Sequence, residues 1–218
     1  ALSLLPKDTV VTIEPEFLKE EGDSGLFGNE RFKLEDLLNL TLIQSSNDGA
    51  SAIASVAGAF GKSPAEDLGR ATFVGAMNKE AKDLGLTQTY FLNPTGLDES
   101  EHISGGYGSA RDVSVLFSHA ITKYPKLFGG TRYESRELTS LSSFLHAVKN
   151  TNTFVRDIPS LLGSKTGYTD LAGGNLTIAF DAGPDRPIVI TVLGSTEKGR
   201  FEDAEKLVWA TLEYLNTN

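Results

Sequence analysis

Two short motifs carry residue types that could do chemistry together. Lys165–Gly167 reads Lys-Thr-Gly within the stretch GSKTGYTDLAGGN, and Ser45–Asn47 reads Ser-Ser-Asn far upstream. Lys-Thr-Gly and Ser-x-Asn are two of the three parts of a known serine acyl-transfer site, and the third part is Ser-x-x-Lys. A lone Lys-Thr-Gly is weak evidence, because one arises by chance in ~3% of chains of this length. The elements around both motifs therefore decide how they are interpreted.

Helical patterns dominate residues 34–125. Residues 34–43 carry leucine and isoleucine on most sides, which predicts a largely buried helix. Ser45 to Asp48 are typical helix-capping residues, so they form a polar joint before an Ala-rich helix. The other elements expected before residue 126 are a strand at 9–13, a loop at 14–32, a helix at 64–85 ended by Gly85, a strand and turn at 89–97, and a helix at 109–125 capped by Ser109.

Strand patterns dominate residues 134–218. Three longer strand-like runs are separated by Gly or Pro, and the last two form a hairpin that turns at AGPDR. The final helix has an apolar side made of Phe201, Ala204, Leu207, Val208 and Leu212. The expected strands are 134–138, 143–149, 151–155, 160–167, 175–183 and 187–195. The prediction is one α+β domain over residues 1–218, with an antiparallel sheet covered by a helix.

Composition narrows the class of protein. The 218 residues are 39% hydrophobic and 22% charged, which is typical of a folded globular chain. The net charge of −9, without a stripe of basic residues, disfavours nucleic acid as a partner. The absence of Cys excludes disulfides, thiolate metal sites and a cysteine nucleophile. The three histidines have no metal-ligand spacing, so His102, His119 and His146 are expected at the surface or in turns, and no metal is expected.

Four segments in order resemble the penicillin-binding D-alanyl-D-alanine carboxypeptidases, over essentially the whole chain. LLNLTLIQSSNDGASAIA looks like the family's Ser-x-Asn segment, and GSKTGYTDLAGGNLTIAF looks like its Lys-Thr-Gly strand and hairpin. Between them, YFLNPTGLD and YGSARDVSVLF are similar to the middle segment, although the family usually has His at the position of Thr95. GSTEKGRFEDAEKL is similar to the closing strand and helix. The resemblance implies a β-lactamase/transpeptidase-like α+β fold.

The resemblance also implies roles for individual residues. Ser45 would relay a proton to and from the nucleophile, and Asn47 would hold the peptide group of the substrate. Lys165 would supply positive potential, and Thr166 would donate a hydrogen bond to the substrate carboxylate. The remaining substrate-binding roles fall to Gly167 for close backbone approach, the Tyr168 N–H for half of the oxyanion hole, and Arg200 for the carboxylate. The structural alternatives are a solvated strand end for Lys165, a surface position for Arg200 and a helix cap for Asn47.

The third motif is not where the resemblance requires it. Only 44 residues precede Ser45 and none of them form Ser-x-x-Lys, so we expect that the sequence begins after the nucleophile helix and lacks the N-terminal strands. The Ser-x-x-Lys at 195–198 is expected in a strand–helix loop rather than at the site. The Glu-x-x-Leu-Asn at 35–39 precedes Ser-x-Asn, in contrast to its place in class A β-lactamases, and is interpreted as ordinary helix. Without a central helix the chain is expected to be marginally stable, to self-associate, or to bury helix 34–43 in another way.

The function implied is a serine D-Ala-D-Ala carboxypeptidase that cleaves peptidoglycan stem peptides through an acyl-enzyme, with this chain inactive alone. The alternatives are a non-catalytic peptidoglycan-binding module and, less favoured, a β-lactamase. The partners implied are a peptide ending in D-Ala-D-Ala and β-lactams, without a cofactor. The location implied is the extracytoplasmic cell envelope, with any membrane anchor outside this chain.

Overall fold

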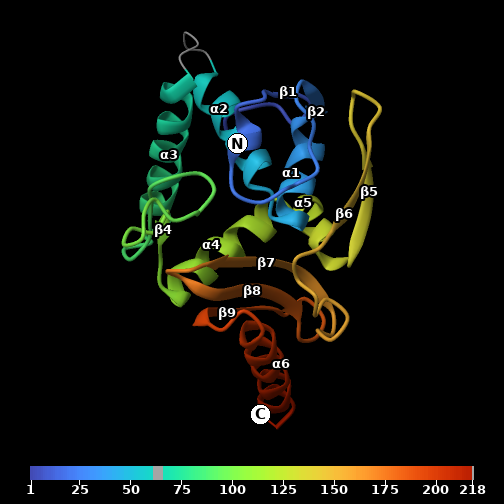
Figure 1. The fold of residues 1–218 in the computed structure, drawn as a ribbon. Helices are drawn as coiled ribbons and strands as arrows, with labels where there is room; N and C mark the ends of the chain where they lie inside the picture. The colour runs from blue at the N-terminus through green and yellow to red at the C-terminus, as the bar shows by residue number, and fades with distance from the viewer. Residues whose placement is uncertain (61–65, 218) are drawn as a thin grey trace.

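The structure is a computed structural model that describes residues 1–60 and 66–217. Its elements fall into a mainly helical part and a part built on a three-stranded sheet, as Figure 1 shows. The first part contains β1 (Val10–Ile13), η1 (Phe17–Lys19), β2 (Glu30–Lys33), α1 (Leu34–Gln44), α2 (Asn47–Ala59), α3 (Glu66–Asp83), β3 (Tyr90–Phe91), β4 (Gly106–Tyr107), α4 (Ala110–Lys123), α5 (Pro125–Phe128) and η2 (Gly129–Arg132). The hairpin of β5 (Ser135–Thr139) and β6 (Leu145–Lys149) packs beside α1 (Figure 1). The second part contains β7 (Leu161–Thr169), β8 (Gly173–Asp181), β9 (Pro187–Ser195) and α6 (Gly199–Thr217).

The expected helices are confirmed within the described residues. The helix predicted at 64–85 corresponds to α3, although its first two residues lie outside the described residues, and Gly85 follows it with a φ of 71°. Ser109 accepts a hydrogen bond from the Asp112 N–H and caps α4, as its side-chain chemistry predicts. Pro125 then starts the short helix α5, because a proline needs no backbone N–H at a first helical position.

Helix α1 lies at the centre of the first hydrophobic core. Its inward residues Leu34, Leu37, Leu40 and Ile43 are fully buried. They pack with side chains from β1, β2, α2, β6 and the N-terminal segment, namely Leu5, Val11, Ile13, Phe17, Leu26, Phe32, Ala52, Ile53, Ala57 and Val148. The expectation that this helix is largely buried is therefore confirmed, and the segment before β1 is part of what covers it.

Two expectations, for residues 30–32 and for His146, are wrong. Residues 30–32 were expected in a loop but belong to β2, antiparallel to β1, with the pairing Ile13 to Glu30. The buried positions of β2 are Glu30 and Phe32, and a buried glutamate hides the period-two apolar pattern of a strand. His146 was expected at the surface but is buried on β6, where its Nε2 lies 2.6 Å from Glu30 Oε1. A partner distant in the sequence makes that burial possible.

The sheet of the second part has the strand order β7-β8-β9 and is antiparallel throughout. Helix α4 packs on one face and α6 on the other, and α6 extends away from the sheet (Figure 1). The predicted hairpin at AGPDR is confirmed between β8 and β9. Residues 151–155 were predicted as a strand but belong to none. The side-chain oxygens of Asn150 and Asn152 accept hydrogen bonds from the N–H groups of Asn152 and Phe154, and these bonds form turns there.

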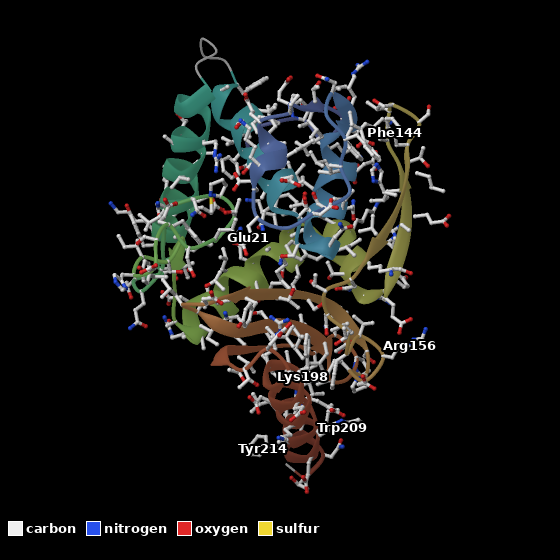
Figure 2. All side chains as sticks on the ribbon, in the orientation of Figure 1. Glu21, Phe144, Arg156, Lys198, Trp209 and Tyr214 are labelled. Carbon is white, nitrogen blue, oxygen red and sulfur yellow. The ribbon has the colours of Figure 1, made fainter. Side chains whose placement is uncertain are left out.

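Helix α6 closes the second core with part of its predicted apolar side. Phe201, Ala204 and Val208 are buried against the sheet, and Leu212 is partly buried. Leu207 was predicted on the same side, but it is 46% exposed because it lies one residue round the helix from Val208. Trp209 and Tyr214, labelled in Figure 2, are also exposed on the outer part of α6. Among the described residues, no helix is both long and apolar enough to cross a bilayer.

Candidate active site

Ser45 lies at the joint between α1 and α2. It ends α1 in the left-handed region, with φ 57° and ψ 44°, and its backbone N–H donates to Thr41 O. A serine there is under backbone strain, which is common where a side chain must point in a required direction. The next residue, Ser46, caps α2 by accepting a hydrogen bond from the Gly49 N–H (2.9 Å). The polar joint predicted at 45–48 thus consists of a C-cap of α1 at Ser45 and an N-cap of α2 at Ser46. The left-handed conformation at Ser45 directs its side chain away from both helices.

Lys165 on β7 reaches this joint. Its Nζ donates to Ser45 Oγ at 2.6 Å and to Thr166 O at 2.6 Å. The tertiary structure therefore brings the two motifs together, although Ser45 and Lys165 are 120 residues apart in the sequence. If the amine is neutral it can instead accept the hydroxyl proton, so the pair can exchange a proton in either direction.

Burial lowers the pKa of Lys165 to about 8, from an ordinary value of 10.5, and the nearby positive charge of Arg200 acts in the same direction. Both causes disfavour the charged amine, since a desolvated ammonium loses hydration and a like charge repels it. A lysine with a pKa near 8 is partly neutral in the pH range where proteins work. The amine can then act as a base toward the hydroxyl group of Ser45.

Arg200 lies at the start of α6 and is only 7% exposed. Its Nη1 donates to Gly167 O at 2.6 Å, so it is attached to the strand that carries Lys165. Its guanidinium also lies over the ring of Phe201, at 4.7 Å from the ring centroid. Burial lowers the pKa of Arg200, but a guanidinium stays charged at neutral pH. The predicted surface alternative for Arg200 is therefore wrong, and Gly167 takes part through its backbone carbonyl.

Thr166 is buried, and its hydroxyl lies 2.5 Å from the hydroxyl of Thr151. Thr151 also donates its backbone N–H to Ile43 O (3.1 Å), two residues before Ser45. Thr151 thus joins the end of α1 to β7 and helps to set the distance between the two motifs. No pattern in the sequence indicates this role for Thr151, because its contacts exist only in the folded chain.

Asn47 opens α2 and faces the same space. Its side-chain Nδ2 donates to Glu21 O (2.8 Å) in the N-terminal loop, and Figure 2 shows Glu21 between the helical part and the sheet. The amide group is therefore held by the loop rather than by a cap interaction of its own helix. The capping role belongs to Ser46 instead.

The direction of the backbone N–H groups along β7 follows from one contact. The Ser164 N–H donates to Thr131 Oγ1 (2.9 Å), on the edge of β7 opposite to β8. Successive N–H groups of a strand point to opposite edges, and the pairing with β8 is regular from Gly163 to Thr169. The N–H groups of Thr166 and Tyr168 therefore face the same outer edge as that of Ser164. The Tyr168 side chain is exposed.

These residues line one cleft of about 870 Å³ between the helical part and the sheet. Its described lining contains the cations Lys165 and Arg200 and neither an aspartate nor a glutamate, in a chain with a net charge of −9. The cleft is thus suited to an anionic group. Within the described residues, no three His, Asp or Glu side chains gather as metal ligands. The predicted site residues that line the cleft are Ser45, Asn47, Lys165, Thr166, Gly167, Tyr168 and Arg200.

The Ser-x-x-Lys at 195–198 lies elsewhere, as expected. Ser195 ends β9 and donates its hydroxyl to Asp203 Oδ2 at 2.8 Å. Neither Ser195 nor Lys198 is among the residues that line the cleft. The Glu-x-x-Leu-Asn at 35–39 is part of α1, also as expected.

Comparisons with known proteins point to one family. The family model described as D-alanyl-D-alanine carboxypeptidase, peptidase S11, matches residues 4–197. D-alanyl-D-alanine carboxypeptidase DacF of Bacillus subtilis is 37% identical over 183 residues, which are 82% of this chain and 42% of DacF. D-alanyl-D-alanine carboxypeptidase DacC of Escherichia coli is 30% identical over 189 residues, which are 86% of this chain and 43% of DacC. The chain spans less than half the length of these two relatives.

Solved structures agree on the fold. The DD-transpeptidase of Streptomyces K15 superposes with a TM-score of 0.79 and 25% identity, covering 94% of this chain and 79% of that one. The D-alanyl-D-alanine carboxypeptidase of Mycobacterium tuberculosis H37Rv has a TM-score of 0.79 and 24% identity, covering 96% of this chain and 76% of that one. The predicted α+β, transpeptidase-like fold class is thereby confirmed. The chain belongs to the D-alanyl-D-alanine carboxypeptidase family, peptidase S11.

Proposed function

We propose that this chain forms the ligand-binding walls of a serine D-Ala-D-Ala carboxypeptidase site, which acts on peptidoglycan stem peptides through an acyl-enzyme. The observation that carries the proposal is the positive cleft. Lys165 and Arg200 line it without an acidic neighbour among the described lining residues, while the chain as a whole is acidic. A peptide that ends in D-Ala-D-Ala presents one free carboxylate, and the half-buried Lys165 with the buried Arg200 suits that group.

The proton path runs through Lys165 and Ser45. Their side chains are 2.6 Å apart, and the lowered pKa of Lys165 lets the amine take up and return a proton near neutral pH. In the proposed reaction of the complete site, a nucleophilic serine of a Ser-x-x-Lys motif, which the described cleft lining of these 218 residues does not contain, attacks the amide between the two D-Ala residues. Ser45 passes the serine proton onward and later delivers one to the leaving amine. Water then releases the acyl group.

The remaining residues position the peptide. Arg200 and the Thr166 hydroxyl bind the terminal carboxylate, and Thr151 holds that hydroxyl in place. Gly167 has no side chain, so a peptide can approach β7 closely and add to its outer edge as a further strand. The Tyr168 N–H faces that edge and donates to the oxyanion that forms on the attacked carbonyl. Asn47 holds a peptide group of the ligand from the opposite wall.

A second candidate function is a non-catalytic module that binds the same peptide ends. It is favoured by the position of the one Ser-x-x-Lys in these 218 residues, because Ser195 is bonded to Asp203 and lies outside the cleft. On either account we propose that the 218 residues alone bind the peptide and do not turn it over. β-Lactams are proposed as ligands of the same cleft, and the extracytoplasmic cell envelope as the location, since peptidoglycan is there.

The binding test compares two peptides that differ in one group. Diacetyl-Lys-D-Ala-D-Ala with a free carboxylate should bind, as measured by titration calorimetry, and its C-terminal amide should bind at least about tenfold more weakly. Arg200→Ala should remove most of that difference. Arg156→Ala is the matched control, because Arg156 is an exposed arginine outside the cleft that pairs with Glu134 (Figure 2). Equal affinity of the wild-type chain for acid and amide would overturn the proposal.

The catalytic part is tested by intact-mass spectrometry after incubation with benzylpenicillin. We expect no covalent adduct on the folded 218-residue chain. A single acyl adduct would show that a nucleophile exists within these residues, and peptide mapping would then identify it.

A further inference from the structure

The cleft has two walls that come from separate parts of the chain. One wall is β7 with the turn into β8, and the other is the loop that carries β3 and β4. In Figure 1 the turn between β7 and β8 points toward the loop beside β4. Thr169, Leu171 and Ala172 line the cleft from the turn, and Thr95, Gly96 and Leu97 line it from the loop.

The carboxylate of Asp98 joins these two walls. Its Oδ1 accepts a hydrogen bond from the Thr169 hydroxyl (3.0 Å), and its Oδ2 accepts one from the Leu171 N–H (3.2 Å). Thr169 Oγ1 in turn accepts from the Ala172 N–H (3.1 Å), so the turn itself is braced at the point of contact. Hydrogen bonds to an ionised acceptor are stronger than neutral ones. Asp98 therefore acts as a clamp between the loop and the β7–β8 turn.

The loop is braced by its own hydrogen bonds next to this clamp. Asn93 accepts from the Gly96 N–H (2.7 Å) through Oδ1 and donates to Leu97 O (2.9 Å) through Nδ2. Residues 93–97 thus form a compact turn whose last residue directly precedes Asp98. Loss of the clamp would free this turn as a unit, and the width of the cleft beside Leu97 would no longer be set.

The charge of the residues that line the cleft changes along β7. The cations belong to the segment near Lys165 and Gly167, because Arg200 is bonded to the Gly167 carbonyl. Farther along β7, beside Thr169 and Leu171, the described lining contributes neutral side chains from the turn and from residues 95–97. A peptide whose carboxylate lies at the cations and which runs along β7 must pass between the walls that Asp98 holds together.

We propose that Asp98 is a positioning residue that builds the part of the cleft occupied by the residues preceding the terminal D-Ala-D-Ala. This inference rests on the proposed function and deepens it. The clamp does not touch the carboxylate end of the ligand. It should therefore raise affinity for a peptide that extends beyond the dipeptide and leave affinity for the dipeptide itself unaffected.

The test uses two probes on the wild-type chain and three variants. Acetyl-D-Ala-D-Ala is the short probe, and diacetyl-Lys-D-Ala-D-Ala is the extended probe. Asp98→Ala should weaken binding of the extended probe by about tenfold and change binding of the short probe by less than about twofold. Asp98→Asn keeps one acceptor oxygen and should give an intermediate loss. Asp170→Ala is the matched control, since it removes an exposed carboxylate from the same turn and should change neither affinity.

A second measurement tests the hydrogen bonds of Asp98 without any ligand. Amide hydrogen exchange at Leu171 should be slow in the wild-type chain and in Asp170→Ala, and fast in Asp98→Ala, because its N–H loses its acceptor. Equal losses for both probes in Asp98→Ala, or no loss for either, would overturn the inference while leaving the proposed function standing. If the wild-type chain bound neither probe, the proposed function would fail and the inference would fail with it. Fast exchange at Leu171 in the wild-type chain would refute the clamp by itself.

Discussion

The lowered pKa of Lys165 makes the electrostatics of the cleft measurable through the pH dependence of the free energy of unfolding. The amine is desolvated and faces the charge of Arg200, and its pKa is lowered from 10.5 to about 8. In the unfolded chain the amine returns to water and to its ordinary pKa. Folding therefore carries an unfavourable term while the amine is protonated, and this term is removed when the amine loses its proton.

The sign and the size of this term follow from proton linkage. Below pH 8 the folded and unfolded states are both protonated, and the folded state bears the full penalty of roughly 3 kcal/mol. Between pH 8 and 10.5 the unfolded state binds more protons than the folded one, so the contribution of Lys165 to stability rises with pH. The same relation assigns about 2 kcal/mol of that change to the interval from pH 7 to pH 9.5.

The perturbation is Lys165→Met, which nearly keeps the length of the side chain and removes the charge. We expect the stability of this variant, measured relative to the wild-type chain by urea denaturation, to fall by about 2 kcal/mol between pH 7 and pH 9.5. The loss of the hydrogen bond to Ser45 shifts the difference at both pH values, so it does not affect the change. Lys198→Met is the control for removing a lysine, because Lys198 is exposed and lies outside the cleft (Figure 2).

One result would refute the reasoning. A stability difference between Lys165→Met and the wild-type chain that stays constant from pH 7 to pH 9.5, or changes in favour of the variant, would mean that burial does not disfavour the ammonium. The base role proposed for Lys165 toward Ser45 would then lose its physical cause.

Two further predictions concern buried contacts within the helical part of the chain. Asp112→Ala should cost about 2–3 kcal/mol in urea denaturation, because the buried carboxylate accepts from the Gln88 N–H (2.8 Å) and its loss leaves that donor without an acceptor. A loss below about 0.5 kcal/mol would contradict this. Gly58→Ala should destabilise the chain by about 1–3 kcal/mol, since the added Cβ would lie 1.8 Å from Gly69 O and force α2 and α3 apart. Gly75→Ala on α3 meets nothing within 4 Å and should instead stabilise by about 0.5–1 kcal/mol, so the opposite order of the two variants would refute the close contact.

Sequence patterns determined most of the local structure. The periodicity of residues 34–43 and the capping chemistry at Ser46 and Ser109 predicted helices that the structure contains, because these signals act over one or two turns. The wrong predictions, for β2 and for His146, have a common origin in contacts beyond that range. A buried Glu30 concealed β2, and it also gave His146 a partner that a surface prediction did not foresee.

The candidate site divides in the same way. Motif chemistry and order, together with a family resemblance, were enough to select Lys165, Ser45 and Arg200 as members of one site. Only the tertiary structure decided how they meet: the left-handed turn at Ser45 directs its hydroxyl to Lys165, and the attachment of Arg200 to Gly167 adds the charge that helps to lower the pKa of that lysine. Thr151 and Asp98 were found only in the structure. A hydrogen bond between segments far apart in the sequence leaves no periodic or local pattern in the residues that make it.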